Sequence, residues 1–185
     1  MINDILDECR EKMNGAIHSL EQDLLGMRGN RASTSLVDRL KIDYYGMESE
    51  LRTLATISTP EPMQIVIRPY DKGAVKAIEK AIMEANLGMN PNTDGDVIRL
   101  NMPPLTRERR QELVKFLHKR LEDARIAIRN VRRSANDDIR EYEKEKMISE
   151  DEAKIGQDKV QKMTDEFVAK VEEMGKIKEA EIMAV

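Results

Sequence analysis

The sequence predicts an α+β protein of two domains. A long three-helix bundle would carry a small α/β domain, like a β/α/β sandwich, inserted between its first and second helices. All six prolines lie between positions 60 and 104, and the last 81 residues contain none. Because proline breaks helices, this distribution separates two helical ends from a mixed middle. Charged residues make up 36% of the chain and aromatic residues 3%, as is typical of long amphipathic helices.

Residues 3–28 are predicted to form the first helix, because apolar side chains recur there at steps of three and four. Asn3 is a candidate N-cap. The apolar stripe consists of Leu6, Cys9, Met13, Ala16, Leu20, Leu24 and Met27.

Residues 106–147 and 149–183 are predicted to form the second and third helices. Thr106 is a candidate N-cap of the second helix, and Ser149 with Glu152 has the S-x-x-E spacing of a capping box. Gly156 and Gly175 are expected to weaken the third helix locally. The second stripe runs from Leu113 to Tyr142, and the third comprises Val160, Met163, Phe167, Val171, Met174 and Ile177. Three such stripes can be buried only against one another, which predicts a bundle.

The middle of the chain has the alternation and turn residues of a small mixed domain. Four strands are predicted, at residues 40–44, 54–57, 64–67 and 97–100. Residues 72–86 are predicted to form a helix with Gly88 as its C-cap, and residues 90–95 a turn. The expected boundaries place 1–30 and 105–185 in the bundle and 31–104 in the inserted domain. A hinge is expected at the two crossings: Gly29, Asn30 and Arg31, then Pro103, Pro104 and Leu105.

The composition and motifs of the chain exclude several kinds of site. The single cysteine excludes an internal disulfide and a cysteine-based zinc site. No apolar run is long enough to span a membrane, and the N-terminus lacks the pattern of a signal peptide, so a soluble cytoplasmic protein is expected. His18 and His118 stand alone, and no nucleotide loop or metal motif is present. We therefore expect no catalytic residues, no metal and no cofactor.

Arginine is concentrated in the second predicted helix. Residues 107–133 carry ten Lys/Arg and four Asp/Glu, a local net charge of +6 in a chain of net charge −4. Arg125, Arg129 and Arg132 share one helix face, with Arg133 beside it. One interpretation is a solvated face paired with acidic side chains of the third helix. The other is a phosphate-binding face, because guanidinium groups bind phosphate through two parallel hydrogen bonds. The expected ligand is then a nucleic-acid backbone of fixed shape, folded RNA rather than a DNA sequence.

Several motifs resemble the bacterial ribosome recycling factor family along the whole chain. They are Met27-Arg28 with Arg31-Ala32-Ser33, Asp43-Tyr44-Tyr45-Gly46, Ile78 to Ile82, Leu87-Gly88 with Asn90-Pro91-Asn92, Pro103 to Thr106 with Arg109-Arg110, Ala127 to Arg133, Ile148 to Asp151, and Gln161-Lys162 with Thr164-Asp165. The sequence departs from the family at Gly29-Asn30, where a Thr-Gly pair is usual. It departs again at Met47 to Glu50, where a proline-containing segment is common.

The resemblance implies an L-shaped, non-enzymatic protein that splits the post-termination ribosome. It implies binding to large-subunit ribosomal RNA and cooperation with elongation factor G and GTP, as a monomer without a membrane partner. Arg129 and Arg132 are the foremost candidates for RNA contacts. The full set of candidate RNA-binding residues is Arg28, Arg31, Arg110, Arg125, Arg129, Arg132 and Arg133.

Two other classes of function remain open from the residues alone. The helical stripes by themselves fit a coiled-coil interaction module, which would self-associate without binding ribosomes. An enzyme using a pocket of the smaller domain would instead retain a small molecule or metal.

Overall fold

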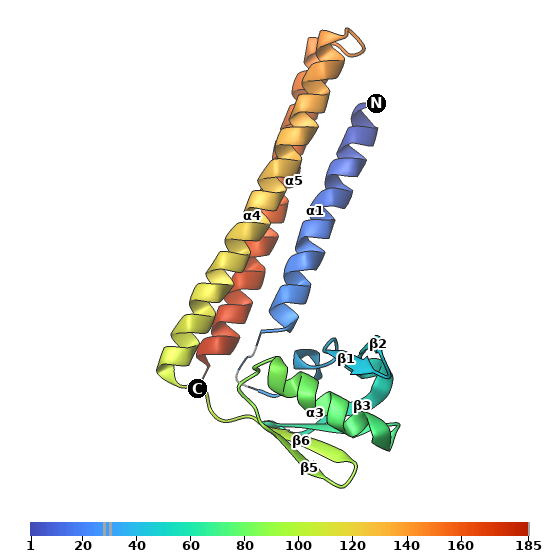
Figure 1. The fold of residues 1–185 in the computed structure, drawn as a ribbon. Coiled ribbons are helices and arrows are strands. Elements are labelled where there is room, and N and C mark those ends of the chain that lie inside the picture. The colour runs from blue at the N-terminus through green and yellow to red at the C-terminus, as the bar shows by residue number, and fades with distance from the viewer. Residues whose placement is uncertain (28, 30, 185) are drawn as a thin grey trace. The chain divides into compact units, whose positions relative to one another are not determined.

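The computed structural model describes residues 1–185 apart from Arg28, Asn30 and Val185 (Figure 1). The chain divides into two compact units. The first comprises Met1–Leu24 with Gln111–Ala180, and the second comprises Leu25–Arg110 with Glu181–Val185. The first unit is helical and the second contains the sheets, so the predicted α+β class is confirmed.

Three long helices build the first unit. They are α1 (Ile2–Leu25), α4 (Arg107–Lys144) and α5 (Glu150–Met183), and they run alongside one another in Figure 1. Each buries one apolar stripe against the other two, as the spacing predicts. Among the described residues of these helices, the side chains with no exposed surface are Met13 on α1, Leu117, Ile128 and Ile139 on α4, and Val160, Val171 and Ile182 on α5.

Some details of the predicted helices are wrong. In α1 the buried residue near the start is Ile5, whereas Leu6 is half-buried. The same helix begins at Ile2, so Asn3 lies inside it and is not its N-cap. In α5, Ile177 is 55% exposed and Ile182 is buried instead. The stripe drifts because 3.6 residues per turn do not match steps of three and four over a long helix.

Local capping signals begin the other two helices where the sequence predicts them. The Thr106 hydroxyl accepts a hydrogen bond from the backbone N–H of Arg109 at 3.2 Å. The Ser149 hydroxyl accepts from the N–H of Glu152 at 3.2 Å, and the Glu152 carboxylate accepts from the N–H of Ser149 at 2.8 Å. This reciprocal pair is the predicted capping box, which satisfies two donors that a helix start leaves free.

The two glycines of α5 allow close packing rather than only weakening the helix. A Cβ atom at Gly156 would lie 3.2 Å from Cδ1 of Ile139 and 3.4 Å from Cγ2 of Ile2. A Cβ atom at Gly175 would overlap the side chain of Leu121. The glycines therefore let large side chains of the neighbouring helices lie directly against the α5 backbone.

The second unit contains two antiparallel sheets. A hairpin of β1 (Lys41–Tyr44) and β2 (Met47–Glu50) forms the smaller sheet. The larger has the order β3-β4-β6-β5 and comprises β3 (Ala55–Glu61), β4 (Gln64–Pro69), β6 (Val97–Asn101) and β5 (Pro91–Asp94). The helix α3 (Val75–Glu84) follows a 3₁₀ turn, η2 (Lys72–Ala74); the short elements η1 (Thr34–Leu36) and α2 (Leu51–Leu54) complete the unit. Its core includes Ile65, Ile67, Ile78, Ile82, Ile98 and Leu100.

The structure corrects three local predictions in this unit. Gly88 is not the C-cap of α3, because the helix ends at Glu84 and Asn86 supplies the left-handed residue, with φ of 49°. The segment from Pro91 is an edge strand rather than a turn, a position where proline costs no ladder hydrogen bond. The predicted strand 54–57 begins one residue later, since Leu54 ends α2. The segment Met47–Glu50, which departs from the family pattern, forms β2.

Tyr44 connects the small hairpin to the start of α3. Its hydroxyl donates a short hydrogen bond to the carboxylate of Asp71, which raises the pKa of Tyr44 to about 12. The same hydrogen bond, with a second from the N–H of Gly73, lowers the pKa of Asp71. Asp71 is also the N-cap of η2. One carboxylate thus fixes both the hairpin and the 3₁₀ turn that precedes α3.

The two chain crossings of the second unit are anchored at adjacent residues. The N–H of Ala32 donates to the carbonyl of Pro62 at 2.7 Å, and the N–H of Met102 donates to the carbonyl of Met63 at 2.8 Å. Both partners lie in the turn between β3 and β4. These two hydrogen bonds tie both ends of the segment 32–102 to the same turn of the large sheet. The predicted boundaries at 30 and 104 and the predicted L-shaped outline stay predictions.

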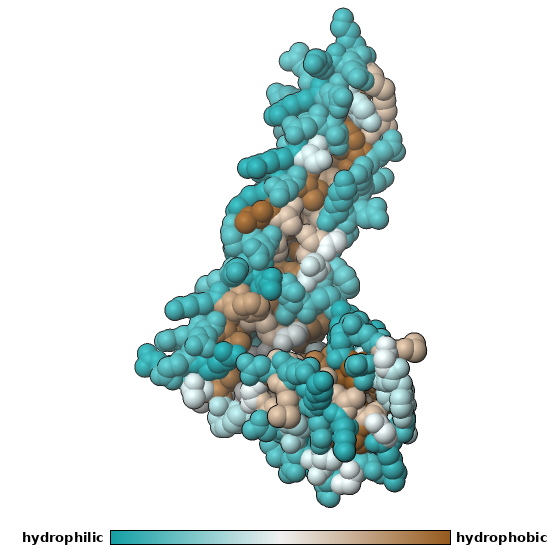
Figure 2. Space-filling model, in the orientation of Figure 1, coloured by the Kyte–Doolittle hydropathy of each residue, from teal (hydrophilic) through white to brown (hydrophobic). Residues whose placement is uncertain are grey.

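Most of the visible surface is hydrophilic (Figure 2). A broken stripe of apolar side chains shows along the helical unit, between hydrophilic side chains. Long charged side chains beside such a stripe cover apolar atoms with their methylene groups while their charges stay in water.

Gly175 offers a test of packing between α4 and α5. Alanine normally stabilises a helix interior by up to about 1 kcal/mol over glycine, and we expect that gain for Gly15→Ala, whose Cβ atom would have no neighbour within 4 Å. Gly175→Ala should instead destabilise the protein by roughly 1–2 kcal/mol, because the new methyl group overpacks against Leu121. In a Leu121→Ala background the same change should stabilise it. Urea unfolding of the four variants measures this, and a stabilising Gly175→Ala in the parent protein would contradict the packing described.

Candidate nucleic-acid interface

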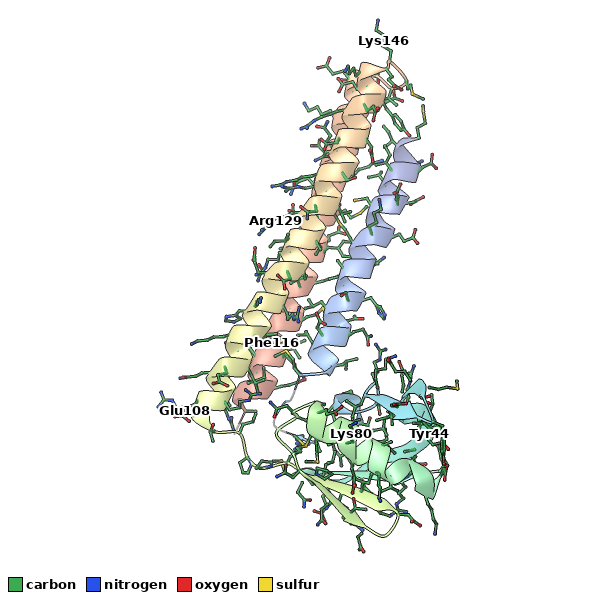
Figure 3. The ribbon with its side chains drawn as sticks, viewed as in Figure 1. Tyr44, Lys80, Glu108, Phe116, Arg129 and Lys146 are labelled. Carbon is green, nitrogen blue, oxygen red and sulfur yellow. The ribbon has the colours of Figure 1, made fainter. Side chains whose placement is uncertain are left out.

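The arginine series lies along one side of α4, as its spacing predicts. Arg129 and Arg133 are exposed, and Arg125 and Arg132 are half-buried. Figure 3 shows Arg129 projecting outward from α4. The four residues fall within a span of nine positions, 125–133, of a helix that is continuous from Arg107 to Lys144. The helix backbone therefore fixes the spacing of the four cationic groups.

Glu122 connects two of these arginines. Its carboxylate oxygens accept hydrogen bonds from Nη1 of Arg125 and Nη1 of Arg129, each at 3.0 Å. The hydrogen bond from Arg125, and then that from Arg129, lowers the pKa of the Glu122 carboxyl group. Both guanidinium groups are therefore paired within their own helix, not with acidic residues of α5 as one interpretation of the sequence would have it.

Arg132 is held by a neutral side chain from the neighbouring helix. Its Nη1 donates to Oε1 of Gln161 at 3.3 Å, and Nε2 of Gln161 donates to Oδ1 of Asp165 at 2.8 Å. Asp165 thus fixes the amide so that its oxygen faces the guanidinium. The neutral amide orders Arg132 without neutralising its charge.

Arg133 differs from the other three. It is exposed, and within the part of the chain that the structure describes it has no hydrogen bond or ion pair. Farther along α4, Arg140 pairs with Asp137 at 3.4 Å. Arg132 and Arg133 together carry two cationic groups that face no carboxylate directly.

The remaining candidate RNA-binding residues have different surroundings. Arg110 is half-buried, and its Nη1 donates to the carbonyls of Met183 and Ala184 at 3.0 and 2.5 Å. This arrangement caps the end of α5, where helix carbonyls lack partners. Arg31 is exposed, and Arg28 lies outside the described residues.

The predicted hinge residues differ in how far their side chains are exposed. Pro103 and Pro104 are exposed, whereas Leu105 is buried at 8% exposure. A Cβ atom at Gly29 would make an ordinary contact with Glu181, at 3.7 Å. Asn30 lies outside the described residues. The hinge stays a prediction.

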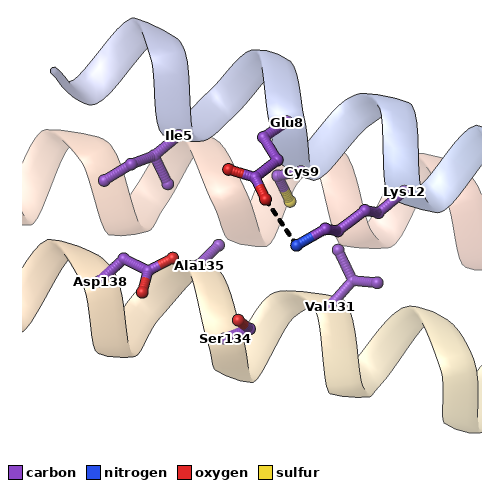
Figure 4. A pocket seen from close by; sticks show the side chains of 8 residues that line it. All are labelled: Ile5, Glu8, Cys9, Lys12, Val131, Ser134, Ala135 and Asp138. Atoms are coloured by element: carbon purple, nitrogen blue, oxygen red, sulfur yellow. Dashed lines mark ion pairs between the residues drawn. The ribbon is translucent and has the colours of Figure 1, made fainter.

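A small hollow lies between α1 and α4 (Figure 4). It is lined by Ile5, Glu8, Cys9, Lys12, Val131, Ser134, Ala135 and Asp138, and Nζ of Lys12 pairs with Glu8 at 2.6 Å. Its volume is about 10 Å³, room for roughly one water molecule. Burial raises the pKa of the Cys9 thiol, which keeps it protonated and unreactive. The hollow therefore cannot hold a substrate.

Among the residues that the structure describes, no group of three or more His, Cys, Asp or Glu is arranged to hold a metal ion. Within the same residues, no helix combines the length and apolar character that crossing a membrane requires.

The family of the chain follows from comparison with known proteins. A family model described as ribosome recycling factor matches residues 20–183. The chain belongs to the ribosome recycling factor family. It is 54% identical over 185 residues to the ribosome-recycling factor of Carboxydothermus hydrogenoformans, with 100% of both chains covered.

Two solved structures share the fold of this family member. A solution structure of ribosome recycling factor is 46% identical with a TM-score of 0.80, covering 100% of this chain and 98% of that one. The second is 41% identical with a TM-score of 0.69 and covers 100% of both chains. It describes the T. thermophilus ribosome recycling factor and the E. coli elongation factor G bound to the E. coli post-termination complex.

Reasoning from the sequence missed two residues that organise the arginines. Glu122 stands three residues before Arg125 and seven before Arg129, a spacing that places all three on one helix face. That spacing could have indicated the pairing. Gln161 lies on another helix, and only the packing of α5 against α4 brings it to Arg132.

Gln161 should order the Arg132 side chain. Gln161→Leu keeps a similar volume but removes the acceptor, so we expect the Arg132 Nε–H to become more mobile on the nanosecond timescale. The free energy of unfolding should change by less than about 1 kcal/mol, because the hydrogen bond is exposed. Nitrogen-15 relaxation of arginine side chains measures the mobility. Gln157→Leu, one turn earlier on α5, is the control, and equal Arg132 mobility in both variants would contradict this role.

Proposed function

We propose that the arginine face of α4, defined as Arg125, Arg129, Arg132 and Arg133, binds large-subunit ribosomal RNA through its phosphates. The chain is a translation factor of ribosome recycling and not an enzyme. With elongation factor G and GTP it would split the post-termination ribosome. One observation carries this proposal: four guanidinium groups lie within nine residues on one rigid helix, inside a segment of net charge +6.

The chemistry of the face favours the RNA backbone over the bases. Guanidinium groups offer several donors in a plane and bind phosphate through parallel hydrogen bonds. No Phe, Trp or Tyr occurs from 117 to 141, so stacking of exposed bases on these side chains is not available there. A row of cations on a straight rod instead fits phosphates held at fixed spacing by folded RNA.

A solved relative supports the choice of partners. The T. thermophilus ribosome recycling factor is described together with E. coli elongation factor G on the E. coli post-termination complex, and it is 41% identical to this chain. We infer the same two partners here. GTP hydrolysis would belong to elongation factor G. We expect the chain to act as a monomer in the cytoplasm, without a cofactor.

The part of the second unit from Ala32 to Met102 would move as one body about the two crossings. Its anchors, Ala32 to Pro62 and Met102 to Met63, tie both crossings to one turn of the large sheet. Bending would then be limited to residues 26–31 and 103–106, which include the predicted hinge. Pro103 and Pro104 have fixed φ angles, so the second crossing would be the stiffer of the two.

Removal of two arginines tests the proposed interface. Arg129→Ala/Arg132→Ala should weaken binding to purified large subunits, since each lost charged contact costs about 1.5–3 kcal/mol. The dependence of binding on salt should become shallower, because fewer phosphates are contacted. Sedimentation binding at several salt concentrations measures both effects. Arg140→Ala/Lys144→Ala, which removes two charges of α4 outside the arginine face, is the comparison, and unchanged affinity in the first variant would remove the proposal.

Loosening the second crossing tests the proposed movement. Pro103→Gly/Pro104→Gly removes the two fixed φ angles while leaving α4 and its arginines in place. We expect binding to the large subunit to persist and the rate of subunit splitting with elongation factor G and GTP to fall. Light scattering of post-termination ribosomes follows the splitting. A splitting rate equal to that of the parent protein would show that the stiffness of this crossing is not needed.

A further inference from the structure

Glu122 occupies one donor nitrogen of each of two arginines that a phosphate would use. One carboxylate oxygen accepts from Arg125 and the other from Arg129, each at 3.0 Å, so both oxygens are engaged. The side chains are 47% exposed for Glu122, 45% for Arg129 and 24% for Arg125. The three groups therefore meet at the surface, where a ligand can reach them.

A carboxylate and a phosphate present similar acceptors to a guanidinium group. Any phosphate that approaches Arg125 and Arg129 must therefore displace Glu122 or bind beside its negative charge. Either route reduces affinity. A glutamate carboxylate is ionised at neutral pH, and the hydrogen bonds from Arg125 and Arg129 lower the pKa of Glu122 further, so the competition persists under physiological conditions.

The other half of the face lacks such a competitor. Arg132 faces the neutral amide of Gln161, and Arg133 has no partner among the described residues. The arginine face thus has an accessible half, Arg132 and Arg133, and a half already paired, Arg125 and Arg129. A free phosphate or a short flexible RNA gains little from the paired half. A rigid partner that engages the accessible half also holds its other phosphates against Glu122.

We propose that Glu122 is a specificity-determining residue that competes with phosphate for Arg125 and Arg129. It lowers the affinity of the face for phosphates that arrive singly, and so favours a partner presenting several at fixed spacing. Because phosphate binding by α4 is part of the proposed function, this role rests on that proposal.

The test is a titration with inorganic phosphate, which needs no ribosome. Glu122→Gln keeps the length and helix propensity of the side chain and removes its charge. The nitrogen-15 signals of the Arg125 and Arg129 side chains should then report phosphate binding about two- to tenfold tighter than in the parent protein, as expected for losing exposed ion pairs. Circular dichroism checks that the helices are intact.

Asp123→Asn is the matched control. It makes the same change of charge one residue away, at a carboxylate that pairs with Arg120 at 3.7 Å and is 53% exposed. Screening by salt should leave its effect on phosphate binding at Arg125 and Arg129 below about twofold. An equal gain in both variants would show a general effect of charge and would overturn the proposal.

A second comparison distinguishes competition of Glu122 with phosphate from ordering of the arginine side chains by Glu122. In an Arg125→Ala/Arg129→Ala background, Glu122→Gln should not change the response of the Arg132 signal to phosphate. Equal or weaker phosphate binding by Glu122→Gln alone would mean that Glu122 orders the arginines rather than competing for them, and the proposal would fall.

Binding of the parent protein and of Glu122→Gln to large subunits is measured separately. If neither the parent protein nor Glu122→Gln binds large subunits, the proposed function is wrong, while the phosphate titration still decides the role of Glu122. If the parent protein binds large subunits and the titration shows no gain for Glu122→Gln, only the inference about Glu122 fails.

Discussion

Mutual burial of three apolar stripes is the constraint on which the rest of the molecule depends. Leu117, Ile128 and Ile139 have no exposed surface, and burying each such side chain contributes roughly 1.5–3 kcal/mol. Because these residues fix the rotation of α4 about its axis, they also fix which residues face away from the core. The arginines follow from that rotation. Rotating α4 about its axis by the angle of one residue would bring guanidinium groups toward the core. Desolvating these charges would cost a large free energy.

The same constraint explains how a protein of net charge −4 presents a cationic surface. Charges of the same sign at steps of three and four repel one another along a helix. Glu122 offsets part of this repulsion at Arg125 and Arg129. At Arg132 the offset is absent, and a neutral amide held by Asp165 orders the side chain instead. The arginine face therefore stands on a stable helix, and its four guanidinium groups are not equally available to a ligand.

Structural features that depend on residues close together in the sequence could be predicted. Features that depend on how separate elements pack could not. The capping residues Thr106 and Ser149 act within one turn, so their spacing alone predicts two helix starts. The close contact of Gly175 with Leu121 depends on how two helices meet, and the sequence indicated only a weak point in the helix. Strand β2 escaped prediction because its residues, Met47 to Glu50, lack alternation. The positive φ angles of Tyr45 and Gly46, 51° and 78°, create the hairpin that pairs it with β1.

The central claim is that the arginine face of α4 lies against large-subunit RNA, and a tethered cleavage probe tests it most directly. Cys9 is only 2% exposed, so a single introduced cysteine can carry an iron chelate that generates hydroxyl radicals. Asn130→Cys places the probe beside Arg129, and Glu11→Cys places it on the outward side of α1, opposite the stripe that includes Cys9 and Met13. On large subunits the probe at position 130 should cleave ribosomal RNA strongly and the probe at position 11 weakly. Equal cleavage from both positions, or cleavage from position 11 alone, would contradict the account.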